Sequence, residues 1–200
     1  MNRTRLRVLA VLMPVVLFLA ACGVNSIPTA EENAKAKWAD VQSQYQRRAD
    51  LIPNLVATVQ GYANQERNVL TAVTEARASA TRVTVSPEQL TDPAAMQRFA
   101  EAQGRLSAAI IPLQRLQENY PELRSNENFM ALQSQLEGTE NRITVARRDY
   151  NGAVQAYNTT IRTFPAVIGA RVIYGSQPMT PFQAEEGAQH APTVRFGNGQ

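Results

Sequence analysis

A strict seven-residue repeat of apolar side chains constrains the fold of this 200-residue chain more than any other feature. It occupies every seventh position from residue 129 to residue 164, at Phe129, Leu136, Ile143, Tyr150, Tyr157 and Phe164. A second stripe lies three residues further on and contains mostly small side chains, at Leu132, Thr139, Ala146, Ala153 and Thr160. Because an α-helix turns once in about 3.6 residues, such a repeat keeps one seam of a long helix against its neighbours. We therefore predict a helix that ends at Phe164-Pro165 and lies in a helical bundle.

A second helical pattern covers residues 31 to about 79. Its apolar positions keep a spacing of three or four residues, at Trp38, Val41, Tyr45, Ile52, Leu55, Val59, Tyr62, Val69 and Val73. Thr29 is the expected N-cap. Pro53 interrupts the pattern, and proline kinks or breaks a helix. The apolar phase is the same before and after it, which favours one long kinked helix over two antiparallel helices broken at Pro53.

A third helix is predicted to begin at Asp92-Pro93, a helix start with proline at the first helical position, and to run to Asn119. Connections are expected at 83–92 and 120–123, the first with one helical turn at 87–90. Short connections imply antiparallel neighbours, so the predicted fold class is all-α: an antiparallel bundle of three to four long helices. Residues 166–174 are apolar enough to pack as a short extra segment, and 175–200 read as an irregular tail.

The amino-terminal residues have the features of a bacterial lipoprotein signal. Three arginines precede an apolar stretch of 14 residues, Val8 to Ala21, which is short for a bilayer span but typical of a secretory signal peptide. Leu19-Ala20-Ala21-Cys22 resembles the lipobox, which implies cleavage after residue 21 and lipidation of Cys22. We expect a signal peptide at 1–21, a lipidated tether at 22–30 and a location at the periplasmic face of the cell envelope. Gly23, in place of an aspartate, favours the outer membrane over the inner one.

Charge and composition exclude several function classes. The whole chain has 20 basic and 17 acidic residues, but the predicted signal peptide holds three arginines and no acid, so 17 of each remain. No basic excess is left to bind nucleic acid. The chain contains one cysteine and one histidine, His190 in the tail, which argues against a metal site, a cofactor or a Cys/His catalytic pair. We expect no enzymatic activity.

Two long blocks of sequence resemble the LemA family. The first is RRADLIPNLV at 47–56, followed by TVQGYA at 58–63. The second begins with YPEL at 120–123 and continues through Tyr150-Asn151, Tyr157-Asn158 and Phe164-Pro165. The resemblance covers about residues 31–174. It implies a membrane-attached bundle of long helices, offers no catalytic residues to carry over, and suggests a scaffolding role, because some members are linked to the biogenesis of membrane organelles.

The charged residues one turn before Pro53 are the first candidate site. Arg47, Arg48 and Asp50, together with Asn54 of the same block, form either a structural charge network at the kink or a site for an anion or a partner. Arg48 falls on the inner stripe, which predicts partial burial beside an acid. Glu140 and Asp149 are the two candidate acids, and the sequence does not choose between them.

Asparagine is a poor residue for a helix interior, yet Asn151 and Asn158 each follow a tyrosine of the seven-residue repeat. We expect them to form hydrogen bonds to another helix that fix its register, with a ligand role as the alternative. Another seven-spaced set, at Asn126, Gln133, Glu140 and Arg147, predicts either a polar flank of the bundle or one side of a partner groove.

The tail carries two phenylalanines, Phe182 and Phe196. Either they cover the end of the bundle near Phe164 and Ile173, or the tail is a recognition segment for a partner.

The favoured function is a non-enzymatic scaffold or adaptor, anchored to the membrane by lipid, that binds unknown envelope proteins. Self-association stays open. The alternative is a periplasmic enzyme subunit or small-ligand sensor built on the Arg47, Arg48 and Asp50 region.

Overall fold

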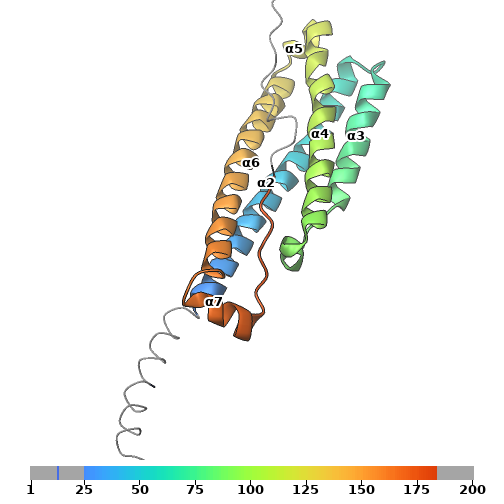
Figure 1. The fold of residues 1–200 in the computed structure, drawn as a ribbon. Coiled ribbons are helices and arrows are strands. Elements are labelled where there is room, and N and C mark those ends of the chain that lie inside the picture. The colour runs from blue at the N-terminus through green and yellow to red at the C-terminus, as the bar shows by residue number, and fades with distance from the viewer. Residues whose placement is uncertain (1–12, 14–24, 184–200) are drawn as a thin grey trace, which may run out of the picture.

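The computed structural model describes residue 13 and residues 25–183, and the regular structure in this part of the chain is entirely helical (Figure 1). Its long helices are α2 (Ser26–Tyr62), α3 (Arg67–Arg82), α4 (Pro93–Asn119) and α6 (Glu127–Thr160). Its short elements are the 3-10 helix η1 (Pro87–Thr91), α5 (Pro121–Arg124), α7 (Ala166–Gly169) and the π-helical η2 (Ala170–Tyr174). The predicted all-α bundle is thereby confirmed. The predicted signal peptide and Cys22 lie outside the described residues.

Helix α2 begins earlier than the sequence pattern predicted. Its first residue is Ser26, and the Thr29 hydroxyl donates to the main-chain oxygen of Asn25 (2.8 Å) from inside the first turn. Ile27 is fully buried in the core. Pro28 fits here because main-chain N–H groups in a first turn have no partner within the helix. Residues 26–30 therefore belong to the bundle, and the predictions of a tether up to residue 30 and of Thr29 as N-cap were wrong.

Helix α2 continues through Pro53, which confirms the favoured prediction that the helix is not broken at this proline. Proline has no N–H, so the oxygen of Ala49 cannot accept the hydrogen bond that residue 53 would normally donate to it. Arg77 of α3 supplies the missing donor, since its Nε donates to the Ala49 oxygen over 2.7 Å. The oxygen left free by the proline is thus satisfied by an arginine of the next helix, and not by the predicted network of Arg47, Arg48 and Asp50.

The chain does turn back, but at residues 63–66 and not at Pro53. The Glu66 amide donates to the Ala63 oxygen (3.0 Å) in the turn, and α3 then runs antiparallel to α2. The expectation of one unbroken helix to residue 79 was wrong. The apolar phase also changes at the turn: Tyr62 is exposed and Val69 half-buried, whereas Leu70 is buried. A three-to-four spacing tolerates such a shift, so the pattern did not reveal the turn.

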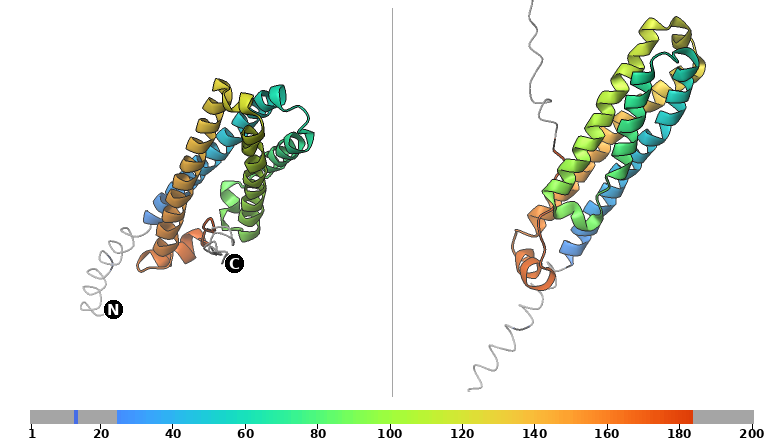
Figure 2. Two further views of the ribbon diagram at one scale, coloured as in Figure 1. Left: turned by 90° about the horizontal axis from the view of Figure 1, so that it is seen from above. Right: turned by 90° about the vertical axis from the view of Figure 1, so that its right-hand side faces the viewer.

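Helices α2 and α6 pack closely along their length, and α3 lies against α2 and α4 (Figures 1 and 2). Helix α4 starts as predicted, with the Asp92 carboxylate accepting from the Ala94 amide (2.9 Å).

On α6 the seven-residue repeat is buried from Phe129 to Tyr157, which confirms the predicted seam. Phe164 is 72% exposed, because α6 ends at Thr160 and the residues that follow leave the helical path. The prediction that the repeat reaches Phe164 was wrong.

The bond between Arg77 and the Ala49 oxygen can be tested by a double-mutant cycle. Arg77→Met keeps most of the aliphatic stem but removes the donor, and should cost about 1–3 kcal/mol of unfolding free energy because a main-chain acceptor loses its partner. In a Pro53→Ala background residue 53 has an N–H of its own, so the same replacement should cost less. Chemical denaturation of the four proteins measures the difference. Equal losses in both backgrounds would show that Arg77 does not compensate for the proline.

Candidate binding groove

Arg48 is the centre of a buried polar network that joins three helices. The side chain is 1% exposed. Its terminal nitrogens donate to Ser107 Oγ (2.7 Å), to Glu140 Oε1 (2.9 Å), and to both the main-chain oxygen (3.1 Å) and Oε1 (2.7 Å) of Gln103. The predicted burial beside an acid is therefore correct, and the acid is Glu140. Because four of the five guanidinium N–H groups serve internal acceptors, an incoming anion would have to displace Glu140.

This network occupies one layer of the bundle and divides the apolar core in two. Trp38, Tyr45 and Phe99 belong to the cluster on one side, whereas Ile52 and Leu106 belong to the cluster on the other. Gln103 also donates to the Ala80 oxygen (3.3 Å), which ties α3 into the layer.

Sequence reasoning missed Gln103 and Ser107. A signal for Gln103 was present, since it stands between Phe99 and Leu106 at a position where the spacing of α4 calls for an apolar side chain.

The other charged candidates near Pro53 do not converge on this layer. Arg47, Asp50 and Asn54 are exposed on α2, and Asp50 accepts a hydrogen bond from Gln46 (2.7 Å). Asp149, the second acid considered for Arg48, lies 3.5 Å from Arg148 in an exposed pair. The structure thus separates Arg48 and Glu140 from the rest of the predicted set.

An extended segment, residues 179–183 (the strap), lies along α6 and is held by both predicted asparagines. Asn158 donates to the Met179 oxygen (2.9 Å) and accepts from its amide (2.9 Å). Asn151 makes the same pair of bonds with Phe182, at 2.9 Å and 2.7 Å. The prediction that these asparagines bond to another helix was wrong. Their side-chain amides instead pair with the main chain of an extended segment, in the way that a neighbouring β-strand pairs with it.

The seven-residue spacing of the two asparagines matches the strap geometrically. Seven residues of an α-helix rise about 10.5 Å, and three residues of an extended chain cover about 10 Å. Asn158 and Asn151 can therefore pair with residues 179 and 182 without distortion of either segment. Between them the Tyr150 hydroxyl donates to the Thr180 oxygen (2.9 Å), and the Thr180 amide donates to the Leu90 oxygen of η1 (2.8 Å). Burial raises the pKa of the Tyr150 phenol, so the hydroxyl stays protonated and remains a donor at neutral pH.

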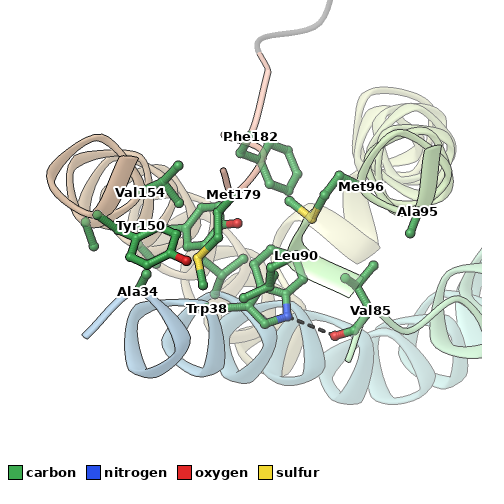
Figure 3. Packing of buried hydrophobic residues seen from close by; sticks show 14 of the residues in the cluster. Ala34, Trp38, Val85, Leu90, Ala95, Met96, Tyr150, Val154, Met179 and Phe182 are labelled. Carbon is green, nitrogen blue, oxygen red and sulfur yellow. Dashed lines mark hydrogen bonds between the residues drawn. The ribbon is translucent and has the colours of Figure 1, made fainter. Parts of the chain in front are cut away.

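Phe182 anchors the strap among aromatic side chains of two helices, α2 and α4. Its ring centroid lies 6.5 Å from that of Trp38, 6.3 Å from that of Tyr45 and 6.3 Å from that of Phe99. Figure 3 shows it beside Met96, with Met179 on the other side of the strap near Tyr150. The Arg147 guanidinium lies 4.1 Å above the Phe182 ring.

The structure bears on two expectations about the tail. Residues 175–183 have no regular secondary structure, as expected, but Met179 and Phe182 pack into the core. Phe182 covers the side of the bundle and not the end near Phe164 and Ile173, both of which are exposed. Phe196 and His190 lie outside the described residues.

Beyond the strap a groove of about 780 Å³ continues between α4 and α6. Gln97, Glu101, Arg105 and Ala108 line it from α4, Glu140, Thr144 and Arg147 line it from α6, and Tyr45 and Arg48 of α2 form its floor. Two members of the seven-spaced polar set, Glu140 and Arg147, thus border a groove, which was the alternative considered for that set. The walls carry both signs of charge and uncharged polar groups, a lining suited to a peptide.

Two other properties of the described residues bear on function. Within residues 25–183 and residue 13, no group of three or more His, Cys, Asp and Glu side chains is placed to hold a metal ion. None of the helices in that part of the chain combines the length and the apolar character that a bilayer crossing requires.

The fold and the groove define the class: an elongated antiparallel bundle of four long helices in the described region, with an extended segment bound along one helix. The chain belongs to the LemA family, whose family model matches residues 37–196. The match extends past Tyr174, where the resemblance in the sequence was expected to end, and includes the strap.

The relatives found among characterised proteins are magnetosome proteins. MamQ 1 and MamQ 2 of Paramagnetospirillum magneticum are each 27% identical over 178 residues, covering 76% of this chain and 63% of the relative. MamQ of Magnetospirillum gryphiswaldense is 25% identical over 157 residues, covering 70% of this chain and 58% of the relative. The chain thus spans about three fifths of the length of the relatives that it matches.

The contribution of the strap is measurable by truncation. A chain that ends at Tyr174 loses the buried Met179 and Phe182 side chains and the four asparagine hydrogen bonds, and should melt several degrees below a chain that ends at Gln183. About 1 kcal/mol shifts the Tm of a domain of this size by roughly 2–4 °C. The chain ending at Gln183 is the matched control, because it retains every contact described above. Equal melting temperatures by circular dichroism would contradict a structural role for the strap.

Proposed function

We propose that this protein is a non-enzymatic scaffold or adaptor of the cell envelope, attached to a membrane through Cys22, whose α4–α6 groove binds an extended segment of a partner protein. The observation that carries the proposal is the strap. Asn151 and Asn158 bind its main chain at both N–H and C=O, and main-chain recognition accepts an extended peptide with few demands on its sequence.

The groove next to the strap has the properties that a second extended segment needs. It begins at Phe182 and Gln183, so a bound segment would continue the line of the strap between the two helices. Along α6, Glu140 is 46% exposed on its side chain although it holds Arg48, which leaves its outer surface available to a donor. Arg147 donates from one terminal nitrogen to the Gln183 oxygen (3.0 Å), and Arg105 lies 3.6 Å from Glu101. Their remaining N–H groups can donate to main-chain oxygens or carboxylates from the two walls.

The alternative function, an enzyme subunit or a small-ligand sensor, was based on a site formed by Arg47, Arg48 and Asp50, and these residues do not come together. Arg47 and Asp50 are exposed on α2 and do not line the groove, and Arg48 is committed to Ser107, Gln103 and Glu140. The names of the relatives also describe magnetosome proteins and not catalysts. A membrane-associated, non-enzymatic role is consistent with those names. The scaffold role is proposed from the strap and the groove of this chain.

Photo-cross-linking in intact cells tests the groove. Ala108 is exposed and lines the groove, whereas Ala131 is exposed on α6 outside it, so p-benzoylphenylalanine at the two positions forms a matched pair. We expect position 108 to yield a discrete adduct with a partner segment that mass spectrometry identifies, and position 131 to yield none. Thr144→Trp, which fills the groove from an exposed site on α6, should abolish the adduct. Identical adducts from both positions, or an adduct that survives Thr144→Trp, would argue against the groove as a binding site.

Membrane attachment has its own test. Cys22→Ser removes the thiol that would carry the diacylglycerol, so incorporation of a fatty-acid analogue should fall to background and the precursor should accumulate. Gly23→Ala retains the cysteine and should retain the label, which controls for a general loss of export. Recovery of the labelled protein in outer-membrane fractions is the further expectation from Gly23. Undiminished labelling of Cys22→Ser would refute lipidation at this residue.

A further inference from the structure

The end of the bundle after α6 exposes a group of large apolar side chains. Phe164 is 72%, Ile168 58%, Val172 78% and Ile173 63% exposed. Tyr174 is also exposed beside them. The opposite face of α7 and η2 is buried through small residues, Ala166, Gly169 and Ala170. This short segment therefore packs on the bundle through its small side chains and presents its large apolar ones to the surroundings, which is the reverse of what core packing favours.

The exposed group lies at the end of the bundle where the amino-terminal segment is attached. Trp38 of α2 packs on Tyr150 of α6 with ring centroids 5.2 Å apart, and Arg48 reaches Glu140, so the two helices are antiparallel. The start of α2 at Ser26 consequently lies beside the end of α6, and α7 is found at that same end in both views (Figures 1 and 2). Residues 1–24, whose apolar stretch and Cys22 indicate membrane attachment, join the chain here.

The charges near this end favour an anionic surface. The sequence from Tyr150 to Ala184 contains no aspartate or glutamate, and its two charged residues, Arg162 and Arg171, are both exposed. Acids do occur nearby at the start of α2, where Glu31 and Glu32 are held by Lys35 in ion pairs of 2.8 and 2.9 Å. Exposed aromatic and aliphatic side chains bordered by arginines are the composition of segments that lie in a lipid interface.

We propose that the surface formed by Phe164, Ile168, Val172, Ile173 and Tyr174 (the end patch) inserts into the interface of a lipid bilayer and holds the bundle end-on against the membrane. A lipid anchor alone leaves a bundle free to tilt on its attachment point, whereas a second contact at the same end fixes its direction. Glu140 is 20 residues from the end of α6 at Thr160, so the groove would be held about 30 Å above the headgroups, at 1.5 Å per residue. The end patch and the groove are separate surfaces, so the proposal does not depend on the groove. The end-on direction rests on the proposed membrane attachment of the amino-terminal segment, whereas insertion of the patch is tested independently of Cys22.

A site-specific fluorescent label tests insertion in the full chain. Val172→Cys places a thiol in the end patch, and Met130→Cys, at an exposed apolar position near the start of α6, places one at the far end of the bundle. Each protein is labelled with the environment-sensitive fluorophore NBD and reconstituted in vesicles of phosphatidylethanolamine and phosphatidylglycerol. The unsubstituted chain reports any labelling of Cys22, which is subtracted.

With vesicles, the label at position 172 should be quenched several-fold more by doxyl lipids than by aqueous iodide, and the label at position 130 should show the reverse. Ile173→Asp in the Val172→Cys protein should lower the quenching by lipid, and pure phosphatidylcholine should do so if the arginines contribute. Equal quenching at the two positions would overturn the end-on arrangement. Insertion would be overturned if iodide quenches the label at position 172 in vesicles. It would also be overturned if, in detergent without lipid vesicles, protection of that label from iodide increases with protein concentration. That result would identify another copy of the chain as the occupant of the end patch.

Discussion

The buried Arg48 guanidinium is the interaction on which the rest of the bundle depends. It donates to α4 at Gln103 and Ser107 and to α6 at Glu140, so α4 and α6 are held at one height relative to α2. A shift of either helix by one turn would remove that helix's acceptors from a buried charge, which costs several kcal/mol. The apolar clusters on either side of this layer would tolerate a helix shift far better, because hydrophobic contact is non-directional. The arginine therefore fixes register, and Arg48, Ser107 and Glu140 of this layer also line the groove between α4 and α6.

Two other main-chain requirements shape the molecule around that layer. Arg77 satisfies the Ala49 oxygen left without a donor by Pro53, which lets α2 stay continuous and ties α3 to it. On the other side, Asn151 and Asn158 pair with the amide and carbonyl groups of Phe182 and Met179, so a segment without regular secondary structure has these main-chain groups satisfied as they would be in a strand. The Arg77 hydrogen bond holds α3 against α2, and the asparagine hydrogen bonds hold the strap over part of the seam between α4 and α6. What remains of the seam is the groove proposed as the partner site.

The sequence alone determined the helical class, the bounds of α4 and the inward face of α6. These features follow from local rules: the seven-residue repeat specifies a seam, and Asp92-Pro93 specifies a helix start. It also placed Arg48 inside the bundle and reduced its acid to two candidates, because an arginine on an apolar stripe must find a partner. It selected Asn151 and Asn158 as unusual, since two asparagines one heptad apart in a helix interior require a reason.

The tertiary structure alone decided which groups those residues meet. Glu140 rather than Asp149 reaches Arg48 because the antiparallel alignment of α2 and α6 sets the two at the same height, and that alignment is a long-range property. The turn at 63–66 left no break in the spacing that a local rule could detect. The strap was unpredictable for the same reason: its residues have no periodicity, and their conformation is imposed by asparagines more than 20 residues away in sequence. Periodic patterns record which face of a helix is buried, whereas partners between helices depend on how the whole chain packs.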